Sequence, residues 1–89
     1  MIANFAHLAN DGSKIYPFNG YGLSLEAEED ALFQAVSELK QGEILRLSID
    51  KNPFVLIRSL VVKYGSKLIF EYLQNREGDV IIDFKRVEE

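Results

Sequence analysis

The sequence has no cysteine, and its 89 residues include only two prolines and one histidine. Without cysteine, the chain has no disulfide, no thiolate nucleophile and no Cys-ligated zinc or iron–sulfur site. No apolar stretch approaches the roughly 20 residues that a membrane-spanning helix needs. The first residues also lack the basic-then-apolar order of a signal peptide, so we expect a cytoplasmic domain without a membrane partner.

Basic residues are in the minority, because ten Lys and Arg residues stand against 14 Asp and Glu residues and the net charge is −4. Nucleic-acid binding draws its affinity from clustered basic side chains, and no such stripe occurs here. We therefore expect no nucleic-acid partner. The hydrophobic fraction of 47% and the charged fraction of 27% are ordinary for a globular chain, and this length allows a single core.

The first third of the chain contains two strand-like stretches and a loop. Residues 2–8 and 14–18 predict an N-terminal hairpin around a turn at residues 10–13. Pro17 has no amide hydrogen to give to a ladder, so the second of these strands should be short or lie at an edge. A glycine-rich aromatic loop follows at residues 19–22.

The first helix should begin after Ser24, a good N-cap, and end near Lys40 and Gly42. Four acidic residues in its opening turns suit the positive end of the helix dipole: Glu26, Glu28, Glu29 and Asp30. Apolar residues at helical spacing form one stripe: Leu25, Leu32, Val36 and Leu39. Phe33 lies off this stripe, and we expect the helix to cover a sheet on one side only.

The middle of the chain predicts a strand and a second helix. Residues 43–49 alternate in the manner of a half-buried strand. The following segment is apolar almost all round and rich in β-branched residues, so its periodicity alone fits either a strand or a helix. Asn52 as N-cap, Pro53 at the first helical position and Gly65 as the stop favour a helix.

Two final strands, at residues 67–74 and 79–87, should pair antiparallel across a hairpin-like linker. The sequence therefore predicts an α+β two-layer sandwich of order β-α-β-α-β-β, with a mixed four-stranded sheet and both helices on one face. Residues 14–89 form this single domain, and residues 1–13 form an extension or an extra strand. The expected core face of the sheet comprises Leu45, Leu47, Ile49, Leu68, Phe70, Tyr72, Val80, Ile82 and Phe84.

The pair Gly22-Leu23, followed one helix later by residues 39–43 (Leu-Lys-Gln-Gly-Glu), resembles the TusA-like (SirA-like) sulfur-carrier superfamily. In that superfamily a Gly-Leu-x-Cys-Pro-x-Pro motif opens the first helix. Here the cysteine position falls on Leu25 and the two prolines fall on Glu26 and Glu28. The resemblance implies the fold, while the residues that carry sulfur transfer are missing.

The second half resembles a cysteine-free relative, the uncharacterised family DUF2249. The residues that carry this resemblance are Asp50-Lys51-Asn52-Pro53 before an apolar helix, Tyr64-Gly65 after it, Glu71-Tyr72-Leu73, and the run from Gly78 to Ile82. The resemblance covers roughly residues 15–87 and rests on framework residues. It implies a fold and no activity.

No combination of residues indicates catalysis or a metal. The acidic opening of the first helix could offer carboxylates to a hard cation, but the helix dipole already accounts for it, and no EF-hand loop is present. His7, with Ser24 and Asp50 as conceivable partners, lacks a nucleophile-elbow sequence. We therefore predict no catalytic residue, no metal site and no cofactor.

The strongest candidate for a ligand or partner site is the aromatic loop. Tyr16, Phe18 and Tyr21 could form a stacking platform beside Ser24 and Leu25, at the end where the sulfur carriers keep their reactive group. The alternative is that these aromatic side chains simply cap the core of a small domain.

Two further surfaces are candidates. The sheet face away from the helices carries Ile44, Arg46, Ile69, Leu73 and Ile81, and it could dock a protein or a second copy of the chain. Scattered apolar residues among charges are equally normal on such a face. Basic residues on and after the second helix could hold an anion, but solvated charge is the ordinary interpretation: Lys51, Arg58, Lys63 and Lys67.

These observations favour a non-enzymatic protein- or ligand-binding module of TusA-like fold. The alternative hypothesis is an accessory protein of sulfur or redox metabolism that has lost the persulfide-carrying cysteine at position 25 but kept a docking surface. A hydrolase or transferase has no supporting residues.

Overall fold

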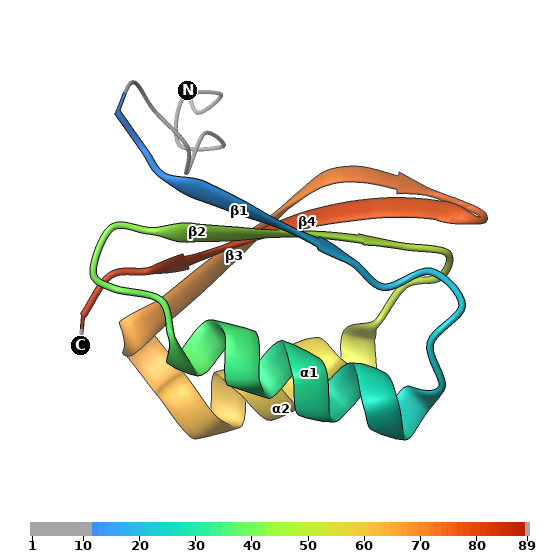
Figure 1. The fold of residues 1–89 in the computed structure, drawn as a ribbon, viewed down its shortest axis with the longest axis horizontal. Helices are drawn as coiled ribbons and strands as arrows, with labels where there is room; N and C mark the ends of the chain where they lie inside the picture. Colours follow the sequence, from blue (N-terminus) through green and yellow to red (C-terminus); the bar gives the residue numbers. More distant parts are fainter. Residues whose placement is uncertain (1–11, 89) are drawn as a thin grey trace.

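A computed structural model describes residues 12–88 of the chain as a four-stranded sheet with two helices packed on one of its faces (Figure 1). The elements in chain order are β1 (Ile15–Asn19), α1 (Leu25–Ser37), β2 (Ile44–Ile49), α2 (Phe54–Tyr64), β3 (Leu68–Arg76) and β4 (Asp79–Arg86). The strand order across the sheet is β1-β2-β4-β3. The predicted α+β sandwich and its order of elements are confirmed, while the hairpin partner expected at residues 2–8 and His7 lie outside the described residues.

The strand β1 occupies an edge of the sheet, as its proline predicts. It runs parallel to β2, whereas β4 is antiparallel to both β2 and β3. The Ile44 amide donates to the Lys14 carbonyl at 2.9 Å and the Gly20 amide donates to the Ser48 carbonyl at 2.7 Å. Even-numbered residues of β1 therefore turn their backbone groups toward β2, and Pro17 lies on the free edge, where its missing N–H breaks no ladder bond.

The helix α1 begins where the sequence predicts and ends earlier. The Ser24 side chain accepts a hydrogen bond from the Ala27 amide at 3.2 Å, which confirms the N-cap. Regular helix stops at Ser37, with Glu38 as the C-cap, instead of continuing to Lys40 and Gly42. The end near Lys40 and Gly42 was wrong because Gly42, with φ at +87°, forms the turn that enters β2.

The helix α2 begins without the side-chain cap that Asn52 predicts. Pro53 is the capping residue and its side chain makes no capping bond. The side-chain oxygen Oδ1 of Asn52 instead accepts a hydrogen bond from the Tyr72 hydroxyl at 2.5 Å, which ties the β2–α2 loop to strand β3. The expected end of the helix at Gly65 is confirmed. Gly65 has φ at +56°, and its backbone N–H donates a hydrogen bond to the Val61 carbonyl.

The core lies between the sheet and the two helices and is almost entirely aliphatic. Its buried members are Leu32, Val36, Leu39, Leu45, Leu47, Ile49, Leu56, Ile57, Leu60, Leu68, Val80, Ile82 and Phe84. Two members of the predicted core are more open. Tyr72 is half-buried, and Phe70 is 40% exposed because it sits on the outer strand β3. Phe33, off the predicted stripe, still packs against this core.

A candidate binding groove at the free edge of the sheet

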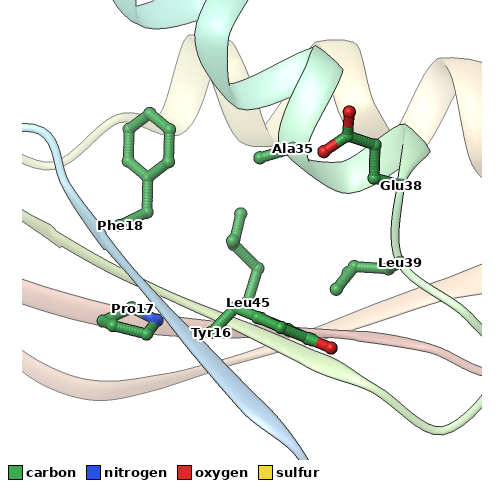
Figure 2. A pocket seen from close by; sticks show the side chains of 7 residues that line it. All are labelled: Tyr16, Pro17, Phe18, Ala35, Glu38, Leu39 and Leu45. Atoms are coloured by element: carbon green, nitrogen blue, oxygen red, sulfur yellow. The ribbon is translucent and has the colours of Figure 1, made fainter.

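A groove of about 350 Å³ opens between the edge strand β1 and the C-terminal half of α1. Figure 2 shows its walls: β1 supplies three neighbouring side chains, β2 supplies one from below, and α1 and its C-terminal end supply the opposite side. The lining residues are Tyr16, Pro17, Phe18, Ala35, Glu38, Leu39 and Leu45. The groove exists because β1 has no further strand beside it and Ala35 is too small to fill the space between helix and sheet.

The chemistry of the groove is apolar with one carboxylate. Phe18 is half-buried against the core, and Leu39 and Leu45 form part of that core. Glu38 is exposed on the helix side of the groove, and its carboxylate accepts a hydrogen bond from the side-chain Nε2 of Gln34 at 3.4 Å. Apolar walls with a single charged group are typical of small-ligand sites, because burial supplies affinity and the charge fixes orientation.

Tyr16 at the mouth of the groove is held in place by charged neighbours. Its hydroxyl donates to a Glu43 carboxylate oxygen at 3.2 Å, and the Lys14 ammonium lies 5.7 Å from its ring centroid. The other Glu43 oxygen accepts from the Lys40 amide at 2.8 Å. The hydrogen bond from the Lys40 amide is the largest influence on Glu43 and lowers the pKa of its carboxyl. Burial opposes this shift, but the Tyr16 hydroxyl and the charges of Lys14 and Lys40 lower the pKa further, so the pKa lies below its ordinary value.

A second, shallower hollow of about 310 Å³ lies on the opposite side of β1, lined by Pro17, Phe18, Asn19, Tyr21, Arg46 and Ser48. Tyr21 is fixed by two hydrogen bonds: its amide donates to the Asn19 side chain at 3.0 Å and its hydroxyl donates to Asp79 at 2.7 Å. The Asp79 bond, burial, and the charges of Asp79 and Asp50 raise the pKa of Tyr21. The aromatic loop is therefore anchored to the β3–β4 hairpin.

The predicted aromatic platform is divided between these two hollows. Tyr16 and Phe18 line the groove, whereas Tyr21 lines the second hollow, and only Phe18 and Pro17 reach both. Ser24 lines neither, because its hydroxyl caps α1, and Leu25 is the first residue of that helix. Ala35 and Glu38 were not predicted as wall residues; a small residue flanking the helical stripe was the one available signal.

Charged residues divide the open sheet face. Arg46 and Asp83 face each other in the β2–β4 register and form a bidentate ion pair at 2.8 and 3.0 Å. Asp83 is 1% exposed, and its carboxylate raises the pKa of the Arg46 guanidinium. Glu71 continues this row on β3, so it separates Ile69 from Ile81.

The five residues proposed for this open face differ in exposure. Ile44 is fully buried, Arg46 and Ile81 are intermediate, and Ile69 and Leu73 are exposed. Leu73 lies at a shift in the β3–β4 register between Tyr72 and Gln74. Because Ile44 offers no surface to a partner, the exposed apolar area of this face is smaller than the sequence pattern suggests.

Glu28 is a site that the sequence analysis did not single out from its acidic neighbours. Glu26 and Asp30 are exposed, but Glu28 is 0% exposed, and neither of its carboxylate oxygens has a hydrogen-bond partner among the described residues. It falls four residues before Leu32 and therefore lies on the same buried side of the helix. Burial raises the pKa of its carboxyl, Lys51 opposes this rise and Asp50 adds to it.

The remaining candidates are the acidic residues at the start of α1 and the basic residues on and around α2. Within residues 12–88, no group of three or more His, Asp or Glu side chains is arranged to hold a metal ion. Asp50 lies 3.7 Å from the Lys51 ammonium. The Lys63 ammonium lies over the rings of Phe33 and Tyr64, at 5.3 and 5.5 Å from their centroids. No helix in the described part of the chain is long and apolar enough to cross a membrane.

The fold and the groove define a small α+β domain with an apolar recess beside a free sheet edge. The chain belongs to the family described as uncharacterized conserved protein DUF2249, which matches residues 23–86. The resemblance seen in the second half of the sequence is thereby confirmed, and the family description names no activity. The match begins after β1, so Tyr16, Pro17 and Phe18 of the groove precede it. No curated protein and no solved structure matches the chain.

Proposed function

We propose that this domain is a non-enzymatic binding module and that the groove beside β1 receives its ligand. The observation that supports this most is the groove itself: about 350 Å³ of space, within the range of small-molecule sites, walled by Tyr16, Phe18, Leu39 and Leu45. An apolar or aromatic group would bury itself against these walls. A positively charged or hydrogen-donating head would then face Glu38.

The non-enzymatic part of the proposal is supported by the kind of residues in the groove. None of the described residues that line it is a serine, threonine, lysine or histidine. Its two titratable groups, Tyr16 and Glu38, are hydrogen-bonded to Glu43 and Gln34 and not to each other, so the groove holds no nucleophile paired with a base. The alternative of a sulfur-metabolism accessory stays a prediction, which transfer of sulfur to a Leu25→Cys variant tests. A cytoplasmic location is part of the same proposal, and fractionation of cells that express the tagged chain tests it.

A pair of probes with the same ring and opposite charge tests the groove. Tryptamine and indole-3-propionate are titrated separately into the isotope-labelled chain while backbone amide shifts are followed by NMR. We expect tryptamine to shift amides of β1 and of the last turn of α1, and indole-3-propionate to bind more weakly because Glu38 repels its carboxylate. Equal affinities, or shifts centred elsewhere, contradict the proposal.

A variant that fills the groove supplies the control. Ala35→Leu places a larger side chain on the groove wall at no substantial cost in helix propensity. Ala31→Leu makes the same change at an exposed position of α1. We expect tryptamine binding to be lost in Ala35→Leu and kept in Ala31→Leu. Binding that survives in Ala35→Leu shows that the ligand site lies elsewhere.

A further inference from the structure

The helix α2 is apolar on both sides, but the described residues cover only one of them. Leu56, Ile57 and Leu60 are buried in the core. The exposed apolar side chains on the other side are Phe54 (66% exposed), Val55 (52%), Val61 (42%) and Val62 (79%). Several large apolar side chains gathered on the exposed side of a helix are typical of a surface that meets a partner. The outer side of α2 therefore lacks the cover that its composition indicates.

These four side chains have a regular geometry. Phe54 and Val61 are seven residues apart, as are Val55 and Val62, so two apolar pairs lie two turns or about 10 Å apart along the helix. Arg58 is four residues after Phe54 and four before Val62, which puts it on the same face between the pairs. Arg58 is exposed and forms no ion pair within the described residues.

Basic residues predominate along this part of the chain. Every charged residue from position 51 to position 70 is basic, although the chain as a whole carries −4. They are Lys51, Arg58, Lys63 and Lys67. Arg58 lies on the exposed face, whereas Lys51 pairs with Asp50 and Lys63 lies against the rings of Phe33 and Tyr64. A surface of this kind attracts acidic partners and disfavours basic ones.

We propose that the outer face of α2 docks an acidic amphipathic helix of another protein. Two apolar side chains of that helix, spaced seven residues apart, cover the Phe54–Val55 and Val61–Val62 pairs. A carboxylate between them pairs with Arg58 in the middle of the interface. The partner helix thus completes the burial that α2 lacks, and its acidic residues complement the basic surroundings.

A second copy of the chain fits this face poorly. A twofold antiparallel pair of α2 helices centred on residue 58 would bring the two Arg58 side chains together, and like charges at the centre of an interface are unfavourable. The acidic helix α1 of another copy has the right charge, but from Glu26 onward its exposed positions carry no large apolar side chain. They are Glu26, Ala27, Asp30, Ala31, Gln34 and Ser37.

A lipid bilayer is also a poor occupant of this face, because Arg58 lies at its centre. Insertion of the apolar face would carry the Arg58 guanidinium toward the hydrocarbon, where a charged side chain is costly. The docking face also shares no residue with the groove beside β1. Failure of the ligand experiments therefore does not count against the docking of a helix on α2. Failure of the peptide experiments likewise does not count against the groove as a ligand site.

Two synthetic helical peptides of about 18 residues test the proposal. Both carry leucines seven residues apart on one face. One has Glu midway between them and the other has Lys. NMR titration of the labelled chain is expected to map the Glu peptide to α2, with an affinity at least about tenfold higher than that of the Lys peptide. Arg58→Glu is expected to reverse this order, whereas Arg76→Glu, at the exposed end of β3, keeps it.

Four results would overturn the proposal. They are equal affinities for the two peptides, amide shifts outside α2, no binding at millimolar peptide, and an unchanged order in Arg58→Glu. Sedimentation of the free chain and flotation with phosphatidylglycerol vesicles are run in parallel. A homodimer lost on Val62→Glu, or vesicle binding lost on the same change, would show that a second copy or a membrane covers this face instead.

Discussion

Replacement of Glu28 by methionine should stabilise the fold. The carboxyl group is fully buried and neither oxygen has a hydrogen-bond partner among the described residues. An unsatisfied buried polar group costs about 1–3 kcal/mol, and methionine has a similar unbranched shape and helix propensity. Loss of a negative charge near the N-terminus of α1 removes about 0.3–1 kcal/mol of favourable dipole interaction. The net gain in the free energy of unfolding should be roughly 1–2 kcal/mol at neutral pH.

The gain should depend on pH, because burial raises the pKa of Glu28 above its unfolded value of 4.5. A carboxyl with a raised pKa binds more protons in the folded state than in the unfolded state. The stability that comes from this extra proton binding is fully present below the unfolded pKa. It is lost as pH rises through the folded pKa, because the buried carboxyl then becomes charged. The advantage of Glu28→Met over the wild type should therefore be smaller at pH 4 than at pH 7, by at most about 1.4 kcal/mol per pH unit within that window.

Urea unfolding followed by circular dichroism measures both effects. With a slope of about 1 kcal/mol per molar urea for a chain of this size, the midpoint at pH 7 should rise by roughly 1–2 M. Glu26→Met makes the same change at an exposed position and should shift the midpoint little. A lower midpoint for Glu28→Met, or the same gain at pH 4 and pH 7, would refute the reasoning. Either result would mean that Glu28 is solvated or paired.

Two further predictions concern the sheet and the aromatic loop. Asp83→Ala should lower the free energy of unfolding by about 1–3 kcal/mol in the same urea assay, because it leaves Arg46, which is one third exposed, without its bidentate partner. An unchanged free energy of unfolding would mean that the Arg46 guanidinium is fully solvated. Asp79→Asn should bring the pKa of Tyr21 down toward its ordinary value in an NMR titration of the ring, because it removes the charged acceptor that holds the phenolic proton. An unchanged titration curve would assign the raised pKa to burial alone.

The sequence was sufficient for the fold because its signals are local and agree with one another. Ser24 caps α1, Gly65 ends α2 and the proline of β1 confines that strand to an edge. The two errors at helix ends have different causes: the end of α1 is set by the Gly42 turn that enters β2, whereas the start of α2 is set by a tertiary contact. Asn52 is a strong capping residue in isolation, but its side chain bonds to Tyr72 on a strand 20 positions away.

The candidate site was only partly predictable. Tyr16 and Phe18 stand out as aromatic residues in a loop-like context, and the structure does bring them into one groove. The opposite wall depends on how closely α1 packs against the sheet edge, and no local signal for Ala35 and Glu38 reports that distance. Glu28 shows the same limit, since its charge and position in the first turns match those of an exposed, dipole-stabilising acid.

Native mass spectrometry of the gently purified full chain, alongside Ala35→Leu and Ala31→Leu, tests the central claim most directly. The account predicts that the wild type and Ala31→Leu carry the same additional small-molecule mass and that Ala35→Leu carries none, because its larger side chain fills the groove. An additional mass retained by all three proteins, or bare protein in all three, would contradict the assignment of the groove as the ligand site.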